Sequence, residues 1–482
     1  MTENRSGATA ARRWAVSILV IAALSSLSKR AAAEKVLVNL DGWQVYTDGR
    51  VGGFVSWAVG DGFPQPMYGV DASGTFVRTP IATPQEGGFR AVSEQNKDNS
   101  LNPPPDVTVL DQGTINIMRL RSGFISNVFG FGVRGPLAPD ISVTGYIQIW
   151  AFVENDGRQK NLPNFADLRQ GYVKVEAPWG SITVGRTRAL FSRGATDIDV
   201  MYAHRWGVGW PGNLDNRGPT LGQLGFGVLG SGFSSALIYG TPVLGGFKLD
   251  VGIFDPVQLQ GNGGWTRTKY VRPEAELTFE QPLGNWGKFV LFANGAYQKV
   301  YKDSYCTPIL DPETNNFLPC DQTVAGAGYG GRLELGPFHL GVAGHYGQGL
   351  GLNYALEVSD AAQDRQGNLR RIAGWYAQSQ LALGDVDLFA GAGLVQIYLT
   401  DYDNKHTVQD PRDPMNPNAR VFPFSVLKSR IGINAGVVYH VAPSLHLDLD
   451  FFRAEADWYP VNNYAGQKQV VWVGNAGMMY NW

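Results

Sequence analysis

Apolar and polar residues alternate one by one along most of this chain, and this period of two constrains its fold more than any other feature. In residues 445–451, three leucines and a phenylalanine alternate with one histidine and two aspartates. Residues 273–280 and 430–440 show the same alternation. Because successive side chains of a β-strand point to opposite faces, each segment predicts a strand with one apolar and one polar face.

The number of alternating segments favours a membrane barrel over a soluble sandwich, which would show the same alternation within each strand. Many segments approach the roughly 9–11 residues that a tilted strand needs to cross a bilayer. The least regular of them is 225–241, where glycines blur the period. Strands are predicted at 43–59, 114–134, 141–154, 168–177, 181–187, 225–241, 247–255, 268–280, 288–301, 324–335, 338–348, 370–383, 386–399, 427–440, 445–455 and 468–482.

The connections between these segments alternate between long and short, as in an up-and-down barrel with long loops at one end and tight turns at the other. A closed barrel also pairs every backbone polar group where a membrane offers no water. The sequence therefore predicts an all-β, transmembrane, antiparallel barrel of sixteen strands. The long connections are 60–113, 155–167, 188–224, 256–267, 302–323, 349–369, 400–426 and 456–467.

Composition and ring placement agree with a strand-built membrane protein. Charged residues make up 17% of the chain, below the roughly 25% that is usual in soluble proteins. The mean hydropathy is nevertheless slightly negative, which argues against a bundle of membrane helices. Aromatic residues near predicted strand ends suit the interface girdles of such barrels. They are Trp43, Trp57, Trp150, Trp375, Trp472 and Tyr480.

The N-terminal segment has the features of an export signal. Basic residues precede an apolar run at 14–27, which is too short to span a membrane comfortably, and Ala31-Ala32-Ala33 offers a cleavage site. We expect a signal peptide at 1–33 and a single barrel domain at 34–482; the alternative is a retained anchor helix. Cleavage removes five basic residues and one acidic residue, so the mature chain is net acidic. No nucleic-acid partner is predicted.

Few residues suggest chemistry other than transport. Cys306 and Cys320 lie in one polar loop, and in an exported protein this spacing favours a local disulfide. The six histidines lack metal-ligand spacing, so no metal or other cofactor is expected. A barrel lipase would need a serine, a histidine and an orienting polar group together, which the sequence does not assemble. The chain is therefore not predicted to be an enzyme.

Three stretches resemble the general porins of Gram-negative bacteria. RQGYVKVEAPWGSITVGRTR, residues 169–188, is similar to the porin strand–turn–strand that leads into the loop folded inside the pore. ALIYGTPVLGGFKLDVGIF, residues 236–254, is similar to the hairpin that follows this loop, with Gly-Thr-Pro where Asp-Ser-Pro is usual. VWVGNAGMMYNW, residues 471–482, resembles the terminal signal that the outer-membrane assembly machinery reads. Tyr480 and Trp482 would carry this signal, although the family more often ends in Phe.

The resemblance implies a homotrimer in which each barrel has its own pore. It also implies that the third long loop, 188–224, folds into the lumen and narrows it. Asp197 and Asp199 would then face basic wall residues across a constriction; the alternative is that the loop charges are merely solvated. Strict alternation places Arg186 on the face of Val184, unless a bulge at Gly185 returns it to the lumen. The predicted basic residues are Arg50, Arg119, Arg121, Lys174 and Arg186.

The sequence thus predicts an outer-membrane channel for passive diffusion of small hydrophilic solutes and ions. Acidic and basic inward positions are mixed, which favours weak selectivity. One alternative is a porin selective for an anion, a sugar or a peptide, and another is a plugged structural or adhesive barrel. The mixed inward positions are Glu274, Glu276, Glu280, Glu334, Asp448 and Asp450 against Arg50, Arg119, Arg121, Arg332 and Arg430.

Overall fold

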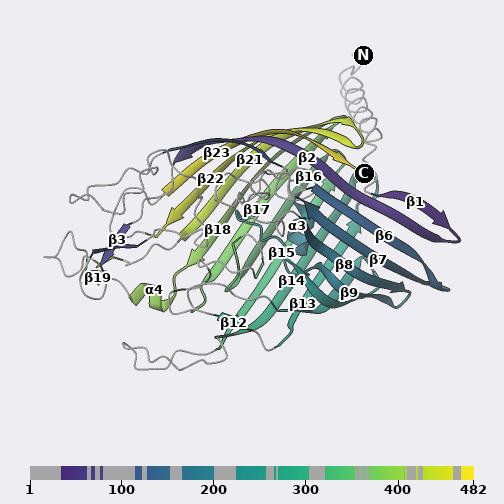
Figure 1. Ribbon diagram of the computed structural model, residues 1–482, viewed down its shortest axis with the longest axis horizontal. Helices are drawn as coiled ribbons and strands as arrows, with labels where there is room; N and C mark the ends of the chain where they lie inside the picture. Colours follow the sequence, from purple (N-terminus) through teal and green to yellow (C-terminus); the bar gives the residue numbers. More distant parts are fainter. Residues whose placement is uncertain are drawn as a thin grey trace, which may run out of the picture.

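The fold is taken from a computed structural model, in which β-strands make up nearly all the regular structure (Figure 1). Among the described residues, no helix is long and apolar enough to cross a membrane. The predicted signal peptide and both cysteines lie outside the described residues. The structure describes residues 34–61, 67–70, 76–79, 114–121, 127–151, 166–199, 224–256, 265–267, 270–302, 321–352, 355–356, 362, 364, 368–405, 408–409, 420–421, 427–459 and 468–482.

Sixteen strand positions form one closed antiparallel barrel, as the sequence predicts. The second position is shared by two consecutive strands, β5 and β6, which both pair with β2. The barrel strands are β2 (Trp43–Asp61), β5 (Thr114–Arg121) with β6 (Asn127–Ala138), β7 (Ile141–Ala151), β8 (Ala166–Ala177), β9 (Gly180–Arg188), β10 (Phe233–Gly240), β11 (Phe247–Phe254), β13 (Arg272–Pro282), β14 (Gly287–Lys302), β15 (Asp321–Leu335), β16 (Phe338–Gln348), β17 (Arg371–Leu383), β18 (Val386–Tyr398), β21 (Leu427–Ala442), β22 (Leu445–Trp458) and β23 (Lys468–Asn481).

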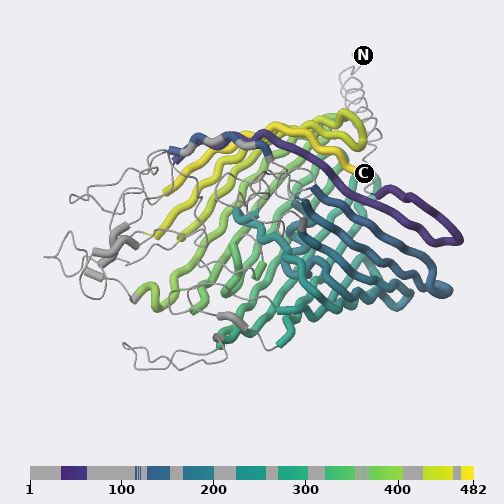
Figure 2. Tube along the Cα trace, viewed as in Figure 1, coloured from purple at the N-terminus to yellow at the C-terminus, as the bar shows by residue number. Residues whose placement is uncertain are grey.

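The barrel closes where the first strand pairs with the last. β2 and β23 are antiparallel in a continuous register from Arg50↔Asn481 to Gly60↔Val471. Figure 2 shows this seam as the purple strand beside the yellow one. Closure leaves no long free sheet edge within the membrane, which satisfies the backbone polar groups there.

The connections separate the barrel into two ends, which we call the turn end and the loop end. At the turn end, Gly336 and Gly384 adopt φ values of +55° and +63° in tight turns, a conformation that glycine reaches without steric cost. β3 (Met67–Val70), α4 (Asp401–Lys405) and β19 (Val408–Gln409), which are described pieces of the long connections, lie at the other end, the loop end (Figure 1). The C-terminal Trp482 lies at the turn end, because the neighbouring Asn481 N–H donates to the Ser444 carbonyl in the turn between β21 and β22.

Several short elements supplement the barrel. β1 extends the sheet at the turn end by pairing with the start of β2. β12 pairs with the loop end of β14. The short elements are β1 (Lys35–Leu40), β3 (Met67–Val70), β4 (Phe76–Thr79), α3 (Arg193–Ile198), β12 (Trp265–Arg267), the 3-10 turn η4 (Gly284–Trp286), α4 (Asp401–Lys405), β19 (Val408–Gln409) and β20 (Arg420–Val421).

The two faces of each strand differ as the alternation predicts. On β22, Leu447, Leu449 and Phe451 are exposed on the outside, and the residues between them are buried inside. In a soluble protein such an apolar exterior would drive association, whereas in a bilayer it matches the lipid chains. The barrel therefore turns its apolar face outward and its polar face inward.

One predicted strand is too long. Residues 225–241 were expected to be one strand, but only β10, Phe233–Gly240, joins the sheet. The preceding residues include Phe226 and Leu229, which have no exposed surface. These apolar residues pack inside the barrel instead of pairing in the sheet. Periodicity alone cannot distinguish a buried irregular segment of this kind from a strand.

Candidate functional site: the barrel interior

The chain that follows β9 turns inward and packs on the opposite wall. α3 contacts the inner faces of β14, β15 and β16. The Tyr376 hydroxyl on β17 donates to the Ala195 carbonyl at 2.7 Å, and the Arg332 guanidinium donates to the Asp197 carbonyl at 3.3 Å. These contacts place the start of the third long loop inside the barrel. Residues 200–223 lie outside the described part of the chain, so the path of the whole loop stays a prediction.

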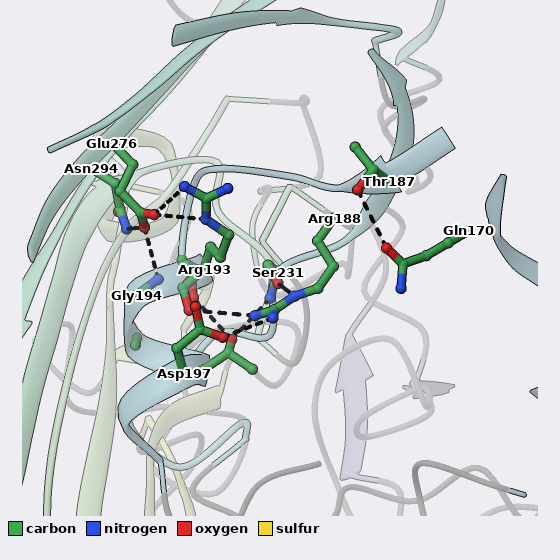
Figure 3. Close-up of polar contacts among 12 residues, drawn as sticks. Gln170, Thr187, Arg188, Arg193, Gly194, Asp197, Ser231, Glu276 and Asn294 are labelled. Carbon is green, nitrogen blue, oxygen red and sulfur yellow. Dashed lines mark hydrogen bonds and ion pairs between the residues drawn. The ribbon is translucent and has the colours of Figure 1, made fainter. Parts of the chain in front are cut away.

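Acidic residues of the wall hold the start of this loop (Figure 3). Arg193 donates to Glu276 at 2.7 Å and also pairs with Asp250. The second oxygen of Glu276 accepts the Gly194 N–H at 2.8 Å and the Asn294 amide at 3.1 Å. With Glu276 only 1% exposed, this arrangement neutralises a buried carboxylate and satisfies its oxygens, as a buried ion pair requires.

A second contact between the wall and the loop lies three residues earlier in the chain, at Phe191. The Phe191 N–H donates to Glu274 at 2.8 Å. Glu274 is fully buried and accepts from Arg272, two residues before it on β13, at 2.7 Å. The wall acids Glu274 and Glu276 are therefore largely committed to positioning the loop.

The two predicted loop acids have different surroundings. Asp197 keeps 48% of its side chain exposed and forms an ion pair with Arg188 at 2.7 Å. Arg188 also donates to Ser231 at 3.2 Å, so it links the two ends of the loop (Figure 3). Asp199 is 1% exposed. Since α3 has its other side on the wall, the exposed Asp197 carboxylate is the one that water and ions in the lumen can reach.

The returning end of the loop, residues 224–232, packs beside α3. The Ala189 N–H donates to the Gly232 carbonyl at 2.8 Å, and the Ser192 hydroxyl donates to the Leu229 carbonyl at 2.6 Å. Phe226 makes an edge-to-face contact with Phe452 on β22, with ring centroids 4.9 Å apart. The two ends of the loop thus contact each other, and together they cover the inner wall as far as β22.

The predicted basic residues lie on three parts of the wall. Arg50 is on the inward row of β2 and is 8% exposed. Lys174, on the inward row of β8, pairs with Glu176 at 2.5 Å. The register pairs Arg119 with Ser56 and Arg121 with Phe54, both inward positions of β2, although neither arginine side chain is described.

Arg186 follows strict alternation. The register through Gly185 is continuous with β8 and β10, and it pairs Arg186 with the exposed Ser235. Gly185 has a φ of +127° but no bulge accompanies it. Arg186 therefore occupies the outward row and does not line the lumen.

The barrel topology sets acid and base on opposite walls. Arg50 lies on the first strand, whereas α3 and Asp197 rest on the ninth to eleventh strands of sixteen. Positions eight strands apart in such a barrel lie diametrically across from each other. This placement fits the transverse field expected of a constriction, and the roles of the individual residues stay predictions.

A hydrogen-bonded row on the wall of β2, β7 and β8 was not singled out from the sequence. The Tyr146 hydroxyl donates to Asp48 at 2.8 Å and accepts from Gln148 at 3.0 Å. The Gln148 carbonyl accepts from Trp150 at 3.0 Å and from Gln170 at 3.1 Å. We call these five residues the tyrosine–glutamine row. The alternation at 146, 148 and 150 was the available signal, because all three positions fall on the polar face.

Glycines make room for this row. An added Cβ at Gly130 would lie 2.3 Å from the Tyr146 hydroxyl, and one at Gly132 would lie 2.2 Å from Tyr46. Tyr46 stacks on Tyr146 with centroids 6.2 Å apart. A larger residue at either glycine would displace the rings, so the spacing of the glycines on β6 shapes this wall.

The chain end predicted to be an assembly signal closes the barrel. The backbone of Trp482 exchanges two 3.0 Å hydrogen bonds with Gly49 of the first strand. Its indole donates to Thr47 at 3.3 Å and stacks on Tyr480, with centroids 6.0 Å apart. Within the described parts of the chain, no cluster of three or more His, Cys, Asp or Glu residues could hold a metal ion.

Comparison with known proteins agrees with this architecture. The structure is similar to the outer membrane channel DcaP of Acinetobacter baumannii, with a TM-score of 0.56 and 13% identity over 93% of this chain and 99% of that one. It is also similar to an anion-selective porin from Comamonas acidovorans, with a TM-score of 0.51 and 12% identity over 91% of this chain and all of the other. A search of curated protein sequences finds no significant match. A model of the family described as Gram-negative porin matches residues 108–481, and the chain therefore belongs to the Gram-negative porins of the outer membrane.

Proposed function

We propose that this channel passes small hydrophilic solutes and ions by passive diffusion, after removal of residues 1–33. The observation that carries the proposal is the exposed carboxylate of Asp197 on a luminal helix, opposite Arg50 on the first strand. Charges of opposite sign across a narrow gap with low-dielectric walls create a field that favours water and ions over apolar solutes.

The interior charges favour weak selectivity. Glu274, Glu276 and Asp250 are paired with arginines, and Lys174 is paired with Glu176. Paired charges contribute little net field at the distances that matter for a passing ion. Of the two predicted loop acids, Asp197 is the more accessible.

A selective channel is the second candidate. The tyrosine–glutamine row combines aromatic faces with amide and carboxylate groups, which suits hydroxyl-rich solutes such as sugars. The burial of Tyr146, at 7% exposed, limits its contact with any solute. Diffusion with weak selectivity therefore remains the first proposal. Block of the ion current by a sugar at millimolar concentration would favour the second.

The assembly is proposed to be a homotrimer, as the family resemblance implies. The outward apolar surface and the closed seam allow each barrel to fold around its own pore. Folding would use the outer-membrane assembly machinery and the surrounding lipid. The mass of the detergent-solubilised protein tests the trimer directly.

Neutralising Asp197 should move the channel towards anions. In planar bilayers with a salt gradient, Asp197→Asn should shift the reversal potential in the anion direction. The shift should shrink at salt concentrations above the physiological value, where the Debye length falls below roughly 8 Å. Asp199→Asn should shift it less, because Asp199 is buried. Asp401→Asn, which removes an exposed charge at the loop end, is the control. An unchanged reversal potential in Asp197→Asn at low salt would contradict the placement of this acid.

Cys306 and Cys320 are proposed to form a disulfide. Thiol labelling of the denatured, unreduced protein should find no free cysteine. Closing a loop of this size stabilises the folded chain by roughly 3 kcal/mol in the chain-entropy model, and most of this effect should be local to the loop. Labelling of both thiols would show that the pair is reduced.

A further inference from the structure

The inner wall of the barrel is apolar at the loop end, over β15, β17 and β18. Val324, Ile372, Val395 and Ile397 all occupy inward positions and have no exposed surface. An open aqueous pore would leave such side chains in contact with water, at a cost proportional to their apolar area. Protein must therefore cover this wall.

The covering residues come from the sixth long connection, between β16 and β17. We call its described residues, 349–352, 355–356, 362, 364 and 368–370, the inner segment. Leu350 and Leu356 are at most 1% exposed and belong to one buried cluster with the wall residues named above. Gly326 on β15 makes this approach possible, because a Cβ there would lie 2.8 Å from Leu350.

The inner segment also contacts the third long loop. The Ala355 N–H donates to the Gly230 carbonyl at 2.9 Å. Phe191 lies 2.8 Å from the same Cβ position of Gly326 that Leu350 approaches. Phe191, Phe226 and Leu229 share the buried cluster of the inner segment. The two connections therefore form one continuous layer on this side of the interior.

A buried ion pair anchors the inner segment. Arg370 donates through Nε and Nη2 to the two oxygens of Asp403, at 2.8 and 2.9 Å. The side chains are 5% and 0% exposed. Asp403 lies in α4, where its carboxylate also accepts the Thr400 N–H at 3.0 Å. Such two-point contacts fix orientation as well as distance.

Hydrogen bonds extend the anchor into the segment. The Thr400 hydroxyl donates to Asp364 at 2.7 Å, and the Asn368 side chain donates to Asp364 at 2.8 Å. The Arg370 N–H donates to the Ala362 carbonyl at 2.8 Å. These bonds join the described residues of the inner segment to one another and to the start of α4, and the Arg370–Asp403 pair is the ion pair among them.

We propose that the inner segment is a second luminal element that restricts the pore alongside the third loop, and that the Arg370–Asp403 pair holds it there. This inference rests on the proposed diffusion function. It confines the water-filled route at the loop end to the wall of β6–β10, because the inward residues Phe54 and Ala58 of β2 belong to the same buried cluster as the apolar layer. The size limit for solutes then depends on two loops instead of one.

Breaking the anchor tests this assignment. Asp403→Asn preserves side-chain size and removes the charge that Arg370 needs. Compared with wild type, its single-channel conductance should rise, and in proteoliposome swelling the uptake of raffinose relative to arabinose should increase. Asp401→Asn removes an exposed charge from the same short helix and should match wild type. Wild-type conductance and solute uptake in a folded Asp403→Asn barrel would overturn the proposal, whereas a wild-type protein that does not conduct would overturn the diffusion function itself.

A tether makes the test independent of how well that variant folds. Gly230→Cys with Ala355→Cys, in a Cys306→Ser, Cys320→Ser background, joins two residues whose backbones are already hydrogen-bonded and so lie within disulfide reach. The oxidised tether should leave conductance at the wild-type level and should restore that level in Asp403→Asn. Reduction should reverse the rescue. An oxidised tether that lowers the conductance of the otherwise wild-type channel would show that the segment normally lies elsewhere.

Discussion

Replacing Trp482 by alanine should strongly reduce the amount of inserted barrel. The indole covers Gly49, whose added Cβ would lie 2.4 Å from the ring; it stacks on Tyr480 and makes a tilted ring contact with Phe129. Losing this partly buried ring costs about 2–3 kcal/mol of apolar burial, at the seam where the last strand must find the first. The family resemblance adds loss of the signal that the assembly machinery reads. Both effects act on closure, so inserted protein should fall on the order of tenfold or more, given about 1.4 kcal/mol per factor of ten.

The measurement is the heat-modifiable band of barrel in purified outer membranes. Trp472→Ala is the matched control, because Trp472 lies on β23, the strand that Trp482 follows, and loses the same ring, but it is 55% exposed. It should insert nearly as well as wild type. Deletion of residues 480–482 should be at least as harmful as Trp482→Ala. Equal insertion of Trp482→Ala and wild type would refute the importance of the terminal ring.

Replacing Glu276 by glutamine should release the start of the third loop. The carboxylate is buried and accepts from Arg193, Gly194 and Asn294. Removing one partner of a buried ion pair costs about 3–5 kcal/mol, and Asp250 will offset part of this cost because it also binds Arg193. We expect a lower midpoint of thermal unfolding and larger current fluctuations in the open channel, because α3 loses its main attachment to β13.

Glu280→Gln is the control for this experiment. Glu280 lies on the same strand and the same inward row, but it is 53% exposed and pairs with Lys288 at 3.1 Å. An exposed pair contributes about 0–1 kcal/mol to stability. This variant should therefore unfold near the wild-type temperature and show wild-type current fluctuations in the open channel. If the two variants behave alike, the wall acids do not hold the loop.

Much of the fold followed from local pattern. Outward positions such as Leu449 and Phe451 alternate with inward Asp448 and Asp450, and this alone indicated strands with a lipid-facing side. The pattern failed at 225–232, where apolar residues are buried against the inner wall rather than paired in the sheet. A buried irregular segment and a buried strand share the same composition, so only the contacts separate them.

The contacts between the site residues depended more on the three-dimensional arrangement of the barrel than on local sequence. Asp197 and Arg50 were identified by residue type and family resemblance, but their placement on opposite sides of the barrel came from the closed topology. Glu276 was assigned to the pore lining from its polar row, and its partner Arg193 lies 83 residues away in the chain. The anchor between Arg370 and Asp403 gave no sequence signal, because each residue reads as an ordinary loop charge.

The sequence by itself determined the strands, their inward and outward faces and the number of barrel positions, because a period of two is a local property of the backbone. Only the tertiary structure decided which charges meet, since pairing across the lumen depends on where sixteen strands close and on how two loops return inside. It also decided that Val395 and Ile397 face protein and not water. An inward apolar residue looks the same in sequence whatever covers it, and its cover comes from a distant part of the chain.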